Sequence, residues 1–249
     1  MDPRYQGGVV SGAEQAVAYD EGLRAYMLKV YNYMTVGLIM TGAVAFAVIQ
    51  VPAISQIFYA EVEVAGRTYA QLQPLGWVAL FAPLLFVWVF ASRIHTMNPS
   101  TAQTLFWVYA GMMGLSLAPI VAVYTSMSIA KVFFMTAGTF GAMSLYGYTT
   151  KRDLTKWGSF LMMGLIGVII AMVVNIFLQS PALHFAISVI GVLVFVGLTA
   201  YDTQRIKSMY SAADGAAVAT RKAIMGALQL YLDFINLFIL LLSLFGNRE

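Results

Sequence analysis

The sequence AIMGALQLYLDFINLFILLLSLF, residues 223–245, decides the class of this protein. It is continuously apolar around a single charged residue, Asp233. Because a helix rises about 1.5 Å per residue, roughly 20 apolar residues cross the hydrocarbon core of a bilayer, which is about 30 Å thick. The segment therefore predicts a transmembrane helix with an acidic residue inside it.

Six further stretches have the same character. Of the 249 residues, 60% are hydrophobic and only 10% are charged, whereas an ordinary soluble domain carries about 25% charged residues. The runs are too long for barrel strands, which cross in about ten residues of alternating character, so helices are expected. We predict an all-α, polytopic membrane protein with seven transmembrane helices. The predicted spans are 26–49, 75–92, 103–123, 129–148, 157–178, 183–201 and 223–245.

The first 25 residues differ from the rest of the chain. Acidic residues alternate there with alanine and glycine, and Gly7 and Gly8 argue against a helix. The order of a secretory signal, a basic stretch followed by a short apolar core and a cleavage site, is missing. We expect a cytoplasmic N-terminal tail at 1–25 and a seven-helix transmembrane domain at 26–249.

Basic residues are distributed unequally between the two sides of the predicted bundle. With the N-terminus inside, only Arg67, Lys131 and Arg248 of the 14 lysines and arginines lie on the outer side. Basic residues concentrate on the cytoplasmic side of membrane proteins. The pattern predicts a cytoplasmic N-terminus and, with seven spans, a C-terminus on the outside.

Two acidic residues lie outside the tails and loops: Asp202, at the cytoplasmic end of span six, and Asp233 in span seven. An ionised carboxylate in hydrocarbon costs at least about 2.5 kcal/mol, so Asp233 must face the bundle interior or water. Spans six and seven are antiparallel, so both aspartates approach the cytoplasmic half. If span seven enters the hydrocarbon at Leu228 rather than Ala223, a direct pair can form. The alternatives are a wet helix end for Asp202 and a structural hydrogen bond for Asp233.

Two further residues are candidates to support the aspartates. Arg93 ends span two, which runs from outside to inside and brings the guanidinium to the same cytoplasmic side. It is a candidate counter-ion, the alternative being an ordinary basic residue at the interface. Asn236 follows Asp233 by three residues and shares its helix face. We expect it either to donate to the carboxylate or to join two helices.

The chain resembles the transmembrane Bax inhibitor motif family, in particular its bacterial members. The resemblance rests on TAYDTQ at 199–204 and YLDFINLFIL at 231–240, and it covers nearly the whole chain after the tail. It implies six helices around a central seventh, a location in the bacterial inner membrane, and a calcium leak gated by pH through Asp202 and Asp233. It also implies that Arg93 latches the carboxylate of Asp202.

The chemistry of two neighbouring carboxylates fits this activity. They repel in a low-dielectric site, so one of them should take up a proton. When ionised, the pair attracts a hard cation such as Ca²⁺ or is held by Arg93, and protonation weakens both interactions. We therefore expect Asp202 and Asp233 to contact Ca²⁺ as a transported ion. Besides the bilayer, calcium ions and protons, no resident cofactor, catalytic residue or nucleic-acid partner is expected, since the basic residues are scattered.

Two other functions stay open. A non-transporting regulator would control a membrane-bound quality-control protease, or act in cell-death or stress signalling, and 1–25 is the segment that such a partner would bind. An intramembrane serine protease is the enzyme alternative, because a GxSx string contains Ser116 and His184 begins span six. The string is a weak signal, since hydroxyl groups on membrane helices usually bond to backbone or to a neighbouring helix.

Overall fold

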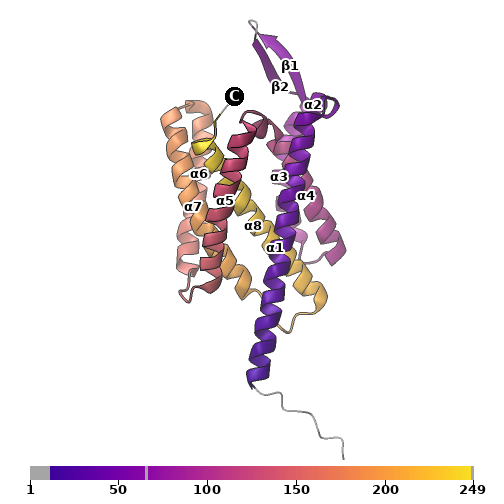
Figure 1. Ribbon diagram of the computed structural model, residues 1–249, viewed down its shortest axis with the longest axis vertical. Helices are drawn as coiled ribbons and strands as arrows, with labels where there is room; N and C mark the ends of the chain where they lie inside the picture. Colours follow the sequence, from indigo (N-terminus) through magenta and orange to yellow (C-terminus); the bar gives the residue numbers. More distant parts are fainter. Residues whose placement is uncertain (1–11, 65–66, 248–249) are drawn as a thin grey trace, which may run out of the picture.

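The computed structural model describes residues 12–64 and 67–247 as a bundle of long helices with a small hairpin at one end (Figure 1). Within these residues, seven helices are long and apolar enough to cross a membrane. The chain is thus an all-α, seven-span membrane protein, as predicted. The spanning helices are α1 (Gly12–Gln50), α3 (Pro74–Arg93), α4 (Pro99–Ala122), α5 (Ser126–Thr149), α6 (Thr155–Leu178), α7 (Pro181–Ser208) and α8 (Ala216–Phe245).

Helix α8 lies at the centre of the bundle. It packs against α1, α4, α5 and α7, and most of its side chains between Ala223 and Leu242 are buried. Helix α6, in contrast, packs mainly on α7 and exposes most of its surface. Figure 1 shows α8 crossing the bundle obliquely behind α1 and α5. The predicted arrangement of six helices around a central seventh is confirmed.

Helix α1 begins at Gly12, well before the predicted start of the first span at residue 26. The expectation of a tail without a helix rested on Gly7 and Gly8, which lie outside the described residues. From residue 12 the sequence is rich in Ala, Glu and Leu, which favour helix. These residues also extend an existing helix, so they bear no separate nucleation cost.

The early turns of α1 pack on the connection between α7 and α8. The ring of Tyr210 lies 5.2 Å from the ring of Tyr19 and 5.7 Å from that of Tyr26. Gly22 lies directly against Tyr210, and a Cβ at this position would collide with the tyrosine hydroxyl group. The extension of α1 is therefore part of the packed structure.

The connection between α1 and α3 contains elements that the sequence did not predict. Helix α2 (Pro52–Phe58) leads into an antiparallel hairpin of β1 (Tyr59–Val64) and β2 (Arg67–Leu72). Figure 1 shows the hairpin beyond the ends of the helices, at the end of the bundle opposite to the start of α1. A two-stranded hairpin of this kind is marginal alone, so the spanning helices define the fold.

Candidate functional site

Two aspartates on adjacent helices form the candidate site. Asp202 lies near the end of α7 and is half-buried, and Asp233 lies in the middle of α8 with 4% of its surface exposed. Their carboxyl groups lie close enough to interact with each other. The structure thus brings together the two residues whose direct contact the sequence left open.

Small residues place α7 close to both α5 and α8. A Cβ at Gly147 of α5 would lie 2.2 Å from the carbonyl oxygen of Ala200 on α7. Gly226 of α8, two turns before the buried aspartate and on the same face, lies against Ile206 of α7. Without a Cβ at these positions, the helix backbones approach closely enough for the two carboxyl groups to meet.

The contact between the aspartates requires a proton. Two ionised carboxylates repel each other, and a hydrogen bond between carboxyl groups forms only when one of them carries a hydrogen. The Oδ2 atom of Asp233 is buried and has no hydrogen-bond partner among the described residues. Leaving such a group unpaired costs about 1–3 kcal/mol. A proton, water or cation that reaches this oxygen is therefore favoured.

Arg205 is a basic residue whose charge acts on Asp202. It lies one turn after Asp202 on α7 and attracts that carboxyl group while remaining exposed. The sequence contained this signal, since residues three apart on a helix are neighbours. Sequence reasoning overlooked it, because a residue next to the loop was taken as part of the general positive charge of that side.

The predicted counter-ion, Arg93, lies elsewhere in this structure. It occupies the last turn of α3, is exposed, and α3 packs mainly on α4. In the part of the chain that the structure describes, no ion pair joins Arg93 to Asp202 or Asp233; an ion pair is found between Lys222 and Asp214. The Arg93 latch is not formed here and stays a prediction.

Asn236 forms a bond other than the expected one. Its Nδ2 donates to the carbonyl oxygen of Leu232 at 2.8 Å, one turn earlier in α8. Asparagine side chains on helices readily bond to nearby backbone. The support of the carboxylate by Asn236 stays a prediction.

A chain of hydroxyl groups leads from α1 to Thr203, the residue after Asp202. Tyr31 of α1 hydrogen-bonds with Ser144 of α5, whose Oγ lies 3.0 Å from Oγ1 of Thr203 on α7. Thr203 and Ser144 are buried, and Thr203 directly follows Asp202. This network could not be predicted from the sequence, because its uncharged members come from three separate helices.

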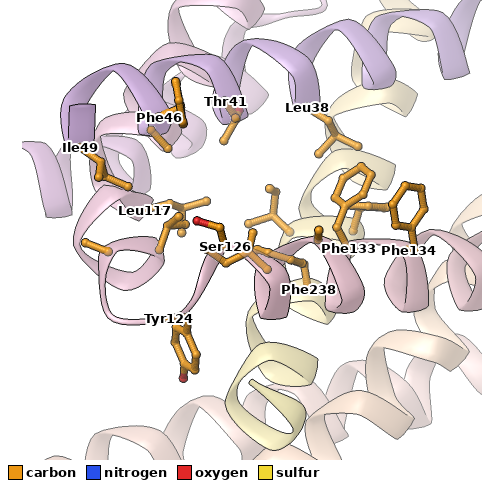
Figure 2. Close-up of a pocket in the computed structure, with 18 of the residues that line it drawn as sticks. Leu38, Thr41, Phe46, Ile49, Leu117, Tyr124, Ser126, Phe133, Phe134 and Phe238 are labelled. Carbon is orange, nitrogen blue, oxygen red and sulfur yellow. The ribbon is translucent and has the colours of Figure 1, made fainter. Parts of the chain in front are cut away.

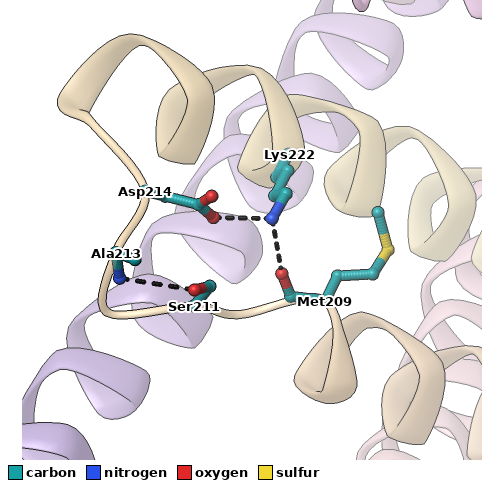
Figure 3. A network of polar contacts seen from close by, with 5 residues as sticks. All are labelled: Met209, Ser211, Ala213, Asp214 and Lys222. Carbon is teal, nitrogen blue, oxygen red and sulfur yellow. Dashed lines mark hydrogen bonds and ion pairs between the residues drawn. The ribbon is translucent and has the colours of Figure 1, made fainter.

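Lys222 fixes the connection between the two helices that carry the aspartates (Figure 3). Its Nζ lies 2.6 Å from Oδ2 of Asp214 and donates to the carbonyl oxygen of Met209 at 3.0 Å. The backbone N–H of Ala213 donates to Oγ of Ser211 at 3.3 Å. These bonds tie the beginning of α8 to the end of α7 and restrict sliding between the helices.

The two residues of the serine-protease alternative have separate partners. Oγ of Ser116 donates to the carbonyl oxygen of Leu80 at 3.4 Å. Nε2 of His184 lies 2.8 Å from Oγ of Ser243, on α8. A nucleophile must lie within hydrogen-bond reach of its base, and the structure does not bring Ser116 and His184 into such a pair.

A cavity of about 640 Å³ lies between α1, α4, α5 and α8, and neither aspartate lines it (Figure 2). Its walls are mostly aliphatic and aromatic. The hydroxyl group of Thr41 is engaged with Oη of Tyr231 at 2.7 Å and with the carbonyl oxygen of Ala110 at 2.9 Å. The cavity therefore offers little to a small cation. Labelled lining residues are Leu38, Thr41, Phe46, Ile49, Leu117, Tyr124, Ser126, Phe133, Phe134 and Phe238.

Known proteins are similar to this chain over nearly its whole length. The model of a family described as inhibitor of apoptosis-promoting Bax1 matches residues 23–249. An uncharacterized protein of Rickettsia prowazekii is 50% identical over 231 residues, which are 93% of each chain. The inner membrane protein YbhL of Escherichia coli K12 is 46% identical over 230 residues, which are 92% of this chain and 94% of YbhL.

Proposed function

This chain belongs to the family of inhibitors of apoptosis-promoting Bax1, and on that premise we propose that it is a proton-sensitive calcium leak protein of the bacterial inner membrane. Its gate is the pair formed by Asp202 and Asp233. The observation that carries the proposal is the juxtaposition of these carboxyl groups, one on α7 and the other buried on the central helix α8.

Proton binding changes the force between the two helices. With a shared proton, the carboxyl groups attract each other and hold α7 against α8. Without it, two negative charges about 4 Å apart repel by roughly 4 kcal/mol at an effective dielectric constant near 20. An energy of this size shifts a two-state equilibrium by about a thousandfold. In the ionised state we expect Arg93 to latch Asp202 and close the leak, so calcium flux rises as the pH falls.

Calcium is the transported ion in this proposal, and the chemistry of the site favours passage over storage. Carboxylate oxygens are suited to hard cations, and Ca²⁺ takes six to eight oxygen ligands. The described residues contain no group of three or more His, Cys, Asp or Glu side chains that would hold a metal ion. Two aspartates alone bind Ca²⁺ weakly, which suits a pathway that the ion must leave again.

Calcium flux into liposomes tests the proposal. Purified protein is reconstituted with a calcium indicator inside, and uptake is measured at a series of pH values between about 5 and 8. We expect uptake to rise at low pH in the wild type, and Asp202→Asn and Asp233→Asn to lose this response. Asp153→Asn, an exposed aspartate in the α5–α6 connection, is the matched control. An unchanged response in Asp233→Asn overturns the proposal.

A further inference from the structure

A groove lies between α1 and α5, at the end of the bundle where α1 begins. Its volume is about 530 Å³. Both helices pack on α8 rather than on each other, which leaves a seam between them. The seam is open at Gly141, where a Cβ would meet no atom within 4 Å. Lining residues are Arg24, Met27, Leu28, Tyr31, Met34, Phe140, Gly141, Ser144, Leu145 and Tyr148.

The groove is apolar along its length and basic at one end. Arg24 is exposed at this end and forms no ion pair within the described part of the chain. Lys207 lies beside Tyr148. The Nζ atom of Lys207 donates to the carbonyl oxygen of Tyr148 at 2.8 Å and lies 4.9 Å from the centroid of the tyrosine ring. Asp20 and Glu21 are also exposed, about one turn further from the hydrocarbon. The mouth of the groove thus presents basic groups at the level where lipid head groups lie.

The length of the groove matches one leaflet of a bilayer. From Arg24 to Met34, α1 rises roughly 15 Å, which is half of a hydrocarbon core about 30 Å thick. We propose that the groove binds one anionic phospholipid, with its phosphate against Arg24 and one acyl chain between α1 and α5. The assignment combines charge complementarity at the mouth with an apolar wall of suitable length behind it.

A lipid in this groove would touch the hydroxyl chain that ends at Thr203. Tyr31 and Ser144 line the groove, and Ser144 bonds to Thr203, the neighbour of Asp202. An influence of the lipid on calcium flux follows from this contact and rests on the proposed function. Binding of the lipid itself does not depend on that function.

Native mass spectrometry of the purified full chain tests the binding. The protein is mixed with phosphatidylglycerol, with phosphatidylcholine of the same acyl chains, or with glycerol phosphate, which has no acyl chain. We expect phosphatidylglycerol to be retained best. Arg24→Gln should weaken its retention by roughly fivefold, since a basic residue near an anionic lipid contributes about 1 kcal/mol. Gly141→Leu should fill the seam and weaken retention of the acyl chain.

Two control variants keep this test specific. Lys156→Gln removes an exposed basic residue of α6 that lies away from the groove, and Gly138→Leu adds a side chain on α5 where a Cβ also meets no atom within 4 Å. Both should retain the lipid. The proposal would be overturned if the two lipids were retained equally, or if the control variants lost as much lipid as the groove variants. Stronger binding of glycerol phosphate, or a lipid-free dimer that Gly141→Leu disrupts, would also overturn it. Circular dichroism checks that each variant is folded.

Flux measurements separate this inference from the proposed function. Tyr31→Phe removes the hydroxyl group and leaves the groove intact, so lipid retention should persist while the difference in flux between phosphatidylglycerol and phosphatidylcholine liposomes decreases. If no liposome supports calcium flux, the proposed function fails and the lipid site stands on the mass spectra. If retention fails while flux remains pH-dependent, the lipid site alone is wrong.

Discussion

Asp202 of α7 and Asp233 of α8 bring their carboxyl groups together, and Oδ2 of Asp233 remains buried without a hydrogen-bond partner among the described residues. A proton shared by the two carboxyl groups would link α7 to α8 inside the membrane-spanning bundle. The unpaired oxygen next to it is a position that a proton or cation can occupy. In the proposed mechanism, stability and gating therefore depend on the same two side chains.

Substitutions of Asp233 should separate bonding from charge. Asn at this position can still donate to the carboxylate of Asp202, whereas Leu leaves that carboxylate without its partner. We expect Asp233→Leu to lose about 1–3 kcal/mol of unfolding free energy and Asp233→Asn about 1 kcal/mol or less. Chemical unfolding in detergent measures both, with Asp20→Leu, at an exposed position of α1, as control. Equal losses in the Asn and Leu variants would contradict a hydrogen-bonded pair.

The predicted Arg93 latch can be tested by distance measurements. The sequence contains no cysteine, so Ser92→Cys on α3 and Ser208→Cys on α7, both exposed, can carry spin labels without background. We expect the label distance to shorten as the pH rises, because the ionised Asp202 attracts Arg93. The change should disappear in an Arg93→Gln background. A distance that is constant across the pH series would remove Arg93 from the mechanism.

Gly147 should tolerate no side chain. A Cβ there would lie 2.2 Å from a backbone oxygen of Ala200, so α5 and α7 must separate to accept even alanine. We expect Gly147→Ala to lose about 1–3 kcal/mol, the usual cost of overpacking, and to disturb the pH response. Gly141→Ala, on the same helix but facing open space, is the matched control. Thermal unfolding of the two variants measures the difference, and similar melting temperatures would contradict it.

The seven spans were predictable, because long apolar runs have few alternatives to membrane helices, and the central position of the last was implied by the family resemblance. The approach of Asp202 to Asp233 was also predictable, since antiparallel spans bring both to one side. Direct contact was not, because it depends on Gly147 and Gly226, whose packing partners the sequence does not reveal. The same holds for the turns of α1 that rest on Tyr210. These features arise from tertiary contacts, which leave no periodic signal in the chain.

Asp153, in the connection between α5 and α6, should show a pKa below its ordinary value of 3.8. Oδ1 of Asp153 accepts two hydrogen bonds from Thr155, one from its hydroxyl group at 2.6 Å and one from its backbone N–H at 2.9 Å. Both bonds favour the ionised carboxylate. The pKa of Asp153 is lower in the folded state than in the unfolded state, so these bonds stabilise the folded protein fully at a pH above the unfolded-state pKa. The stabilisation is lost as the pH falls through the folded-state pKa. NMR titration measures the pKa, and Thr155→Val should raise it. If Asp153 has the same pKa in the wild type and in Thr155→Val, the hydroxyl group is not the main cause of the lowered pKa.

The loop that joins the two aspartate helices should depend on Lys222 more than on its acidic partner. Lys222 bonds to both Asp214 and the carbonyl oxygen of Met209, so Lys222→Met removes two bonds and Asp214→Asn weakens one. The side chains of Lys222 and Asp214 are 26% and 17% exposed, so solvent screens the pair and their coupling in a double-mutant cycle should be about 1 kcal/mol or less. Hydrogen exchange of residues 209–216 should accelerate most in Lys222→Met and remain unchanged in Lys156→Met, a basic residue of α6. If Asp214→Asn accelerates exchange as much as Lys222→Met, the bond to Met209 contributes nothing, and the ion pair alone connects α7 to α8.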